Sequence, residues 1–138
     1  MTAQPAFRPD EVKHLEFLQA VIARHANTSF LVKSWAMTVS GAFVAVATRG
    51  PSWRTAAVAV GLAAGFWLLD SYYLRQERRF RTLYEKVADR SAQVPPFTMD
   101  AEQYGGPVSW REVALSRTML LSYGVLVAID TMTVVFLA

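Results

Sequence analysis

The sequence predicts an all-α integral membrane protein with three transmembrane helices, because three long apolar segments carry almost no charge. These segments cover residues 30–47, 55–74 and 118–138. The third contains one charged residue, Asp130, and at about 1.5 Å per residue it spans the roughly 30 Å hydrocarbon core of a bilayer. The chain is 53% hydrophobic and 18% charged, and its apolar residues are gathered in blocks, which supports the same class.

The distribution of basic residues predicts the orientation of these spans. Of the 14 Lys and Arg residues, twelve lie at or before Lys33 or between the second and third spans. Only Arg49 and Arg54 lie in the short link between the first two spans. By the positive-inside rule, we expect the N-terminus and the long middle segment in the cytoplasm and the C-terminus on the outer face.

Four arginines follow the second span closely: Arg75, Arg78, Arg79 and Arg81. A basic cluster beside a membrane is expected to contact anionic lipid headgroups. Nucleic-acid binding is the alternative, and the position next to a span disfavours it. Membrane lipids are therefore the first partners that the sequence predicts.

The elements are expected in the following order. Residues 1–8 have no periodicity and form a tail. Residues 9–90 form an extended antiparallel hairpin: an amphipathic helix leads into the first span, a tight turn covers residues 49–54, and the second span continues into the cytoplasm. With no stop signal before about Arg90, the second helix has about 36 residues and projects some 20 to 25 Å beyond the membrane.

The cytoplasmic parts of these two helices carry apolar stripes that are expected to bury each other. Leu15, Leu18 and Ile22 recur at helical spacing on the leading helix, and Phe80 and Leu83 do so on the second. A tight outer turn brings the two stripes together. The alternative is a leading helix that lies flat on the membrane surface.

The remainder of the chain is expected to be a loop followed by a helix. Residues 91–108 contain three prolines and two glycines, a composition typical of loops. Residues 109–138 are predicted to form the third span, with Ser109 as its N-cap and Glu112 completing a capping box.

Two charged residues lie near the inner ends of the first two spans. Lys33 and Asp70 reach a similar depth if these spans are antiparallel, so an ion pair between them is one prediction. The alternative is that Lys33 extends to the inner surface and Asp70 only marks the end of its span.

The third span carries a polar stripe at seven-residue spacing. Ser116, Tyr123 and Asp130 share one helical face, which is expected to meet protein or water rather than lipid. A pore or ion path and a hydrogen-bonded packing seam are both consistent with this stripe.

Small residues are expected to mark where the first two spans pack. Ala57, Gly61 and Gly65 form two small-xxx-small steps in the second span, and Thr38 and Gly41 belong to a small or polar stripe in the first. Three short spans bury few contacts by themselves. A homo-oligomer is therefore expected.

The sequence offers no pattern that indicates an enzyme, and we expect a non-enzymatic protein without a cofactor. It lacks a glycine-rich phosphate loop, a Gly-x-Ser-x-Gly elbow and a His-Glu-x-x-His helix, and it has no cysteine. His14 and His25 share a helical face, but two imidazoles with no nearby thiolate are a weak indication of a metal site, and ordinary interface histidines are the alternative.

Several segments resemble a family of small, multi-span bacterial inner-membrane proteins. They are residues 14–17 (HLEF), 27–35 (NTSFLVKSW), 66–78 (FWLLDSYYLRQER) and 97–100 (FTMD). The resemblance covers most of the chain beyond residue 10 and includes Lys33 and Asp70. It implies a bacterial inner membrane, and with the orientation expected from the basic residues the C-terminus then lies in the periplasm or outside. Some similar proteins accompany anti-phage systems, where membrane permeabilisation is the usual proposal.

Two functions are consistent with these features. The first is a non-enzymatic oligomer that acts as a pore-like or membrane-perturbing component, in anti-phage defence if the resemblance extends to function. The second is an accessory or scaffold subunit whose cytoplasmic helical hairpin docks a protein partner. A continuous polar lumen would favour the first, and a closed centre would favour the second.

Overall fold

The computed structural model describes residues 7–50, 52–89 and 93–137, and throughout this part of the chain every regular element is a helix. The helices are α1 (Pro9–Ala47), α2 (Trp53–Asp89), α3 (Ala101–Tyr104), α4 (Trp110–Ala114) and α5 (Arg117–Leu137). Three of them, α1, α2 and α5, are long and apolar enough to cross a membrane. The all-α class and the three helices of spanning length are confirmed.

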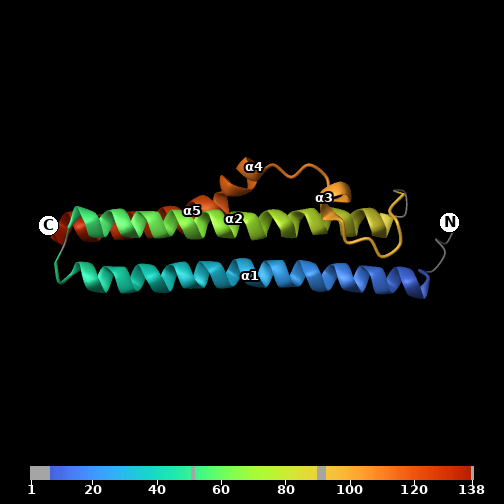
Figure 1. Ribbon diagram of the computed structural model, residues 1–138, viewed down its shortest axis with the longest axis horizontal. Coiled ribbons are helices and arrows are strands. Elements are labelled where there is room, and N and C mark those ends of the chain that lie inside the picture. Colours follow the sequence, from blue (N-terminus) through green and yellow to red (C-terminus); the bar gives the residue numbers. More distant parts are fainter. Residues whose placement is uncertain (1–6, 51, 90–92, 138) are drawn as a thin grey trace.

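α1 and α2 lie side by side and antiparallel over their whole length (Figure 1). They contain 39 and 37 residues, so each is about 55 to 60 Å long, roughly twice the thickness of a bilayer core. Their ends meet at the turn around Thr48, whose backbone N–H donates to the Val44 carbonyl at 3.2 Å. One half of this hairpin therefore extends well beyond the part that α5 accompanies.

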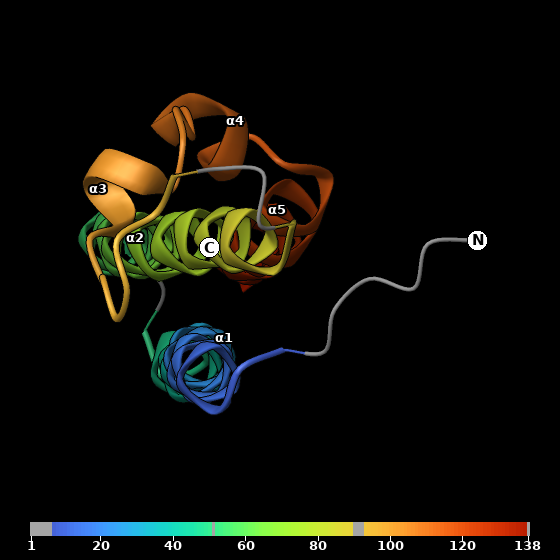
Figure 2. The same ribbon diagram turned by 90° about the vertical axis from the view of Figure 1, so that its right-hand side faces the viewer.

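α5 packs beside the half of the hairpin that is nearest this turn (Figures 1 and 2). Met119 and Tyr123 of α5 pack with Ala36 of α1 in one buried cluster. Further towards the turn, Val134 packs against a second cluster that includes Phe43. The start of α1 and the end of α5 consequently lie at opposite ends of the molecule.

The other half of the hairpin is closed by the chain that returns from α2. Leu18 of α1, Leu83 of α2 and Ala101 of α3 form a buried cluster, so the two predicted stripes do meet. The returning segment is attached to α2 by side chains that donate to backbone carbonyls. Lys86 Nζ lies 2.8 Å from the Tyr104 oxygen, and Arg75 Nε lies 2.9 Å from the Val108 oxygen.

The third span does not run unbroken through 109–138 as predicted. α4 ends at Ala114 and α5 begins at Arg117, and the loop predicted for residues 91–108 contains the short helix α3. Ser109 is the N-cap of α4, but its side chain makes no capping hydrogen bond, so the expected capping box is absent. The indole N–H of Trp67 donates instead to the Ala114 carbonyl at 3.0 Å, which fixes the C-terminal end of α4 on α2.

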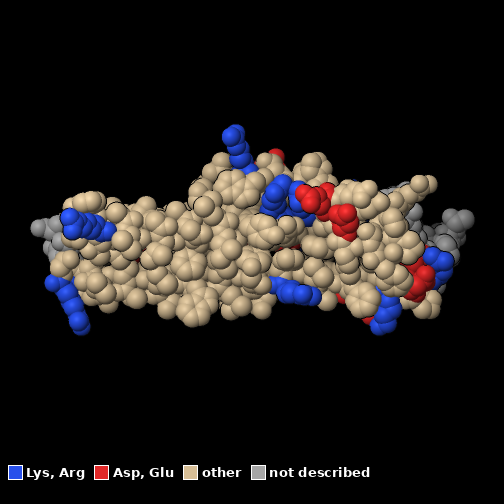
Figure 3. All heavy atoms as spheres, in the orientation of Figure 1, with Lys and Arg blue, Asp and Glu red and all other residues tan. Residues whose placement is uncertain are grey.

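The surface of the half that contains α5 is apolar. Figure 3 shows a long tan region there, with basic side chains at its far end and further charges only around mid-length and beyond. Its large exposed side chains come from all three long helices: Phe30, Trp35, Met37, Val46, Val58, Leu68, Leu121, Val125, Met132 and Phe136. A surface of this kind is compatible with insertion into lipid.

Candidate functional site

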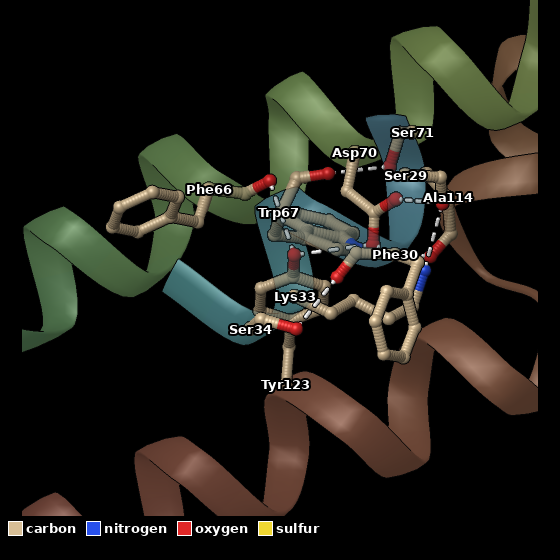
Figure 4. Close-up of polar contacts among 10 residues, drawn as sticks. All are labelled: Ser29, Phe30, Lys33, Ser34, Phe66, Trp67, Asp70, Ser71, Ala114 and Tyr123. Carbon is tan, nitrogen blue, oxygen red and sulfur yellow. Dashed lines mark hydrogen bonds and ion pairs between the residues drawn. The ribbon is translucent and has the colours of Figure 1, made fainter. Parts of the chain in front are cut away.

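The principal polar site lies where α1, α2 and α5 meet, and we call it the Asp70 cluster: Ser29, Lys33, Asp70 and Tyr123 (Figure 4). Asp70 has no solvent exposure. Its Oδ2 lies 2.6 Å from Lys33 Nζ, and its Oδ1 accepts a hydrogen bond from the Ser29 hydroxyl. Lys33 Nζ also donates to Ser29 Oγ at 2.9 Å. The ion pair predicted from the sequence is present.

Tyr123 connects this ion pair to α5. Its hydroxyl lies 3.1 Å from Asp70 Oδ2 and 3.3 Å from the Phe66 carbonyl oxygen. One O–H donates to one acceptor at a time, and an ionised carboxylate is the stronger acceptor. All three long helices therefore contribute a side chain that binds the same carboxylate.

Helical spacing explains why the Asp70 cluster forms. Ser29 and Lys33 are four residues apart and lie on one face of α1, so both side chains reach the same point on α2. An ionised carboxylate in a low-dielectric environment is stable only when its charge and its lone pairs are satisfied. Asp70 meets this condition through one cation and two hydroxyl groups.

A second buried carboxylate, Asp130, lies further along α5. It is 3% exposed, and its Oδ1 accepts a hydrogen bond from Ser40 Oγ of α1 at 2.6 Å. The space beside it amounts to about 10 Å³, at the lower limit for a single water molecule. Asp130 thus faces a narrow seam between helices of one chain. Whether an oligomer adds a lumen elsewhere stays a prediction.

Ser116 lies outside the stripe that the sequence assigned to it. It sits in the break between α4 and α5, so only Tyr123 and Asp130 share the face of α5. Its Oγ is buried and has no hydrogen-bond partner among the described residues. The seven-residue spacing is misleading here, because the helix that carries Tyr123 and Asp130 begins only after Ser116.

The prediction that small residues join the first two spans is wrong. Ala57, Gly61, Gly65, Thr38 and Gly41 are all exposed, and an added Cβ at any of the three glycines would meet nothing within 4 Å. The residues that face the neighbouring helices include Ala36 and Ser40 on α1 and Ala59 and Ala63 on α2.

The cause of this error is the rotation of the helices about their axes. Ala57, Gly61, Gly65 and Thr38 are each two positions from an inward-facing residue, which is about 200° of helical turn, and Gly41 is one position from Ser40, which is about 100°. Ser29, Ser40 and Asp70 occupy inward positions, because a carboxylate left without partners on an apolar surface costs more than close packing of small residues gains. The polar contacts therefore determine the rotation, and the small residues face outward.

The four arginines after the second span have different environments. Arg75 binds the Val108 carbonyl, and Arg81 forms an ion pair with Glu77 one turn earlier on α2. The Nε atom of Arg79 is buried without a hydrogen-bond partner in the described part of the chain. Contact of this group with anionic lipid stays a prediction.

The two histidines make separate contacts. His14 Nε2 donates to the Thr98 carbonyl at 2.8 Å, and the ring of His25 stacks on Phe80 with centroids 5.5 Å apart. Within the ranges that the structure describes, no group of three or more His, Asp or Glu side chains is arranged to hold a metal ion.

Sequence reasoning missed three residues of these sites: Ser29, Ser40 and Trp67. Ser29 and Lys33 are four residues apart, and Ser29 and Ser40 are eleven apart, which is about three helical turns. That recurrence on one face of an apolar helix was the available signal. Nothing in the sequence indicated that Trp67 would bind the end of α4.

No family model, curated protein or solved structure matches the chain significantly. The resemblance to a family of small bacterial inner-membrane proteins stays a prediction.

Proposed function

We propose that the protein is a non-enzymatic accessory or scaffold subunit of a bacterial inner membrane, with the extended half of its hairpin in the cytoplasm as a docking platform. The observation that carries this proposal is that the polar seam is narrow and that its carboxylates are paired within the chain. Asp70 and Asp130 bind partners of their own chain, and the space beside Asp130 is about 10 Å³. Such a seam suits a rigid anchor better than a conduit.

The extended half has the properties of a platform. Its apolar cluster around Leu18 and Leu83 is covered by the returning segment, so it needs no lipid to stay folded. Near its tip, Phe17 and Phe97 are 50% and 48% exposed, with ring centroids 6.5 Å apart. Exposed aromatic groups outside a membrane are typical of protein interaction sites.

Site-specific photo-crosslinking in cells tests the platform. A photoreactive residue at Phe97 is expected to form a discrete adduct with a soluble protein, and the adduct should weaken severalfold when Phe17 is also changed to Glu. The matched control places the probe at Phe136, which is 78% exposed in the apolar region. If the probe at Phe97 gave no more adduct with soluble proteins than the control probe at Phe136, the result would contradict docking.

Reporter fusions test the orientation, which rests on the positive-inside rule. A reporter fused after α5 should be active only if it functions in the periplasm, and one fused before α1 only if it functions in the cytoplasm. The opposite pattern would place the platform on the outer side and overturn the proposal.

A pore-like or membrane-perturbing oligomer is the second candidate, in anti-phage defence if the family resemblance extends to function. The outward position of Thr38, Gly41, Gly61 and Gly65 favours it, because these residues leave close-packing surfaces available to further copies. Mass determination of the detergent-solubilised complex measures the oligomer. Steady conductance in planar bilayers that changes in Asp130→Asn would favour the pore, and a non-conducting wild type favours the scaffold.

A further inference from the structure

An open cleft of about 330 Å³ lies between α1, α2 and the segment around α3. The residues that line it include His25 of α1, Gln76 and Arg79 of α2, and Glu102 of α3. It is separate from the Asp70 cluster, and neither proposed function uses it.

The depth of the cleft matches a membrane surface. Tyr72, which also lines it, lies within the last residues of the predicted span 55–74, and His25 precedes the span that begins at residue 30 by five residues. Five residues of helix correspond to about 7.5 Å. If the three long helices are inserted, as the proposed function requires, phospholipid headgroups lie at this level.

Arg79 supplies a cation that lines this cleft and forms no ion pair with a described residue. Its Nε is buried and has no acceptor among the residues described. Its backbone is held by Gly105, where an added Cβ would come within 2.7 Å of the Arg79 carbonyl oxygen. A guanidinium group without a counter-charge favours a ligand that brings anionic oxygens into the cleft.

The charges around the cleft specify the kind of ligand. A guanidinium group binds phosphate oxygens through two parallel hydrogen bonds. Glu102 makes no ion pair with a described residue, and the Asp100 carboxylate is occupied with the backbone N–H groups of Glu102 and Gln103. Figure 3 shows basic and acidic side chains adjoining close to α3. A phosphate next to an ammonium group complements this arrangement.

We infer that this cleft binds the headgroup of a zwitterionic phospholipid, with the phosphate on Arg79 and the ammonium group towards Glu102. The inference depends on membrane insertion but not on docking of a partner. A negative crosslinking experiment would therefore leave the lipid-binding inference standing. A negative lipid-binding experiment would leave the docking proposal standing.

Binding of short-chain lipids to the purified full-length protein in detergent tests the inference. Phosphatidylethanolamine is expected to bind about tenfold more weakly to Arg79→Gln. Arg78→Gln removes the same charge from the adjacent position, which does not line the cleft, and should change affinity less than twofold. Equal weakening by both variants would reduce the effect to general charge and overturn the inference.

Three further comparisons identify the ligand. Glu102→Gln should weaken phosphatidylethanolamine severalfold and leave phosphatidylglycerol unchanged; weakening of both alike would refute the role of the ammonium group. Diacylglycerol of the same chain length should not bind at this site. If phosphoethanolamine or inorganic phosphate bound as tightly as the lipid, the ligand would be soluble and the lipid assignment wrong.

The helical content and thermal stability of each variant, measured by circular dichroism, must match those of the wild type for the binding loss to be assigned to the cleft. Arg79→Lys replaces Arg79→Gln if the latter is unfolded.

Discussion

The two buried carboxylates of this protein differ in how their charge is balanced. Asp70 has a cation at 2.6 Å, a hydroxyl from Ser29 and a hydroxyl from Tyr123. Asp130 has one hydroxyl, from Ser40, and no cation within ion-pair distance among the described residues. Asp70 is therefore part of a charge-balanced network, whereas Asp130 is held by a single hydrogen bond. A substitution that removes charge but keeps shape should separate them.

The largest effect is expected from Asp70→Asn. The amide preserves the shape but leaves Lys33 without its counter-charge in an environment where only 20% of its side chain is exposed. Breaking a buried pair from one side costs about 3 to 5 kcal/mol, and we expect about 3 because of this partial exposure. Unfolding of the detergent-solubilised protein by a graded denaturant measures the loss.

A charge swap checks that the loss comes from the pair. Lys33→Asp and Asp70→Lys should each lower the amount of folded protein, and the double variant should recover part of it. Strictly additive losses would show that the two residues do not interact.

A smaller effect is expected from Tyr123→Phe. This change removes the hydroxyl that binds Asp70 Oδ2 and keeps the buried ring. A hydrogen bond to a charged group contributes about 1.5 to 3 kcal/mol, and we expect the lower value because the ion pair remains. The same denaturant experiment applies. A loss as large as that of Asp70→Asn would mean that α5, rather than the ion pair, holds the cluster together.

Asp130→Asn should cost less than about 1 kcal/mol. The amide oxygen still accepts the Ser40 hydroxyl hydrogen, and no described cation loses a partner. Comparison with Asp70→Asn in the same assay is the sharpest test of the difference between the two sites. Equal losses would show that Asp130 has a charged partner outside this chain, as an oligomer could provide.

The smallest effect concerns His25, outside the spans. Burial lowers the pKa of His25 from its usual value near 6.5, Arg24 lowers it further, and Glu77 opposes the shift. The unpacked chain therefore binds the proton first. Packing of the extended half is most stable above about pH 6.5 and weakens as the pH falls below it.

Hydrogen exchange of residues 15–25 at pH 7.5 and 5.5 measures this dependence. Exchange should become faster at the lower pH in the wild type beyond the intrinsic change, and His25→Gln should reduce the difference. A packing that tightens on acidification would contradict the stated sign.

The sequence predicts the helices of this protein better than their rotation. Apolar segments and the missing stop signal after residue 74 are local properties, and they determine α1 and α2 almost to their ends. The Lys33–Asp70 pair could be predicted because antiparallel helices place residues of known depth side by side. The position of Gly61 and Gly65 could not, because which face turns inward depends on all polar contacts together.

The break before α5 was missed for a related reason. The break at residues 115–116 involves neither Gly nor Pro. The pattern at Ser109 and Glu112 also suggested that the helix had already begun. At this interruption the indole N–H of Trp67 donates to the Ala114 carbonyl, a contact between residues 47 positions apart. Local sequence does not encode such a contact.

The location of Lys33 and Asp70 within one hairpin also bears on the order in which the chain is synthesised. Both helices leave the ribosome before α5, so the hairpin can neutralise its own charges while the rest of the protein is still unmade. Asp130 depends on a serine that was made 90 residues earlier. Its carboxylate therefore finds a partner only when α5 reaches a hairpin already in place, and the order of synthesis becomes the order in which the polar groups are paired.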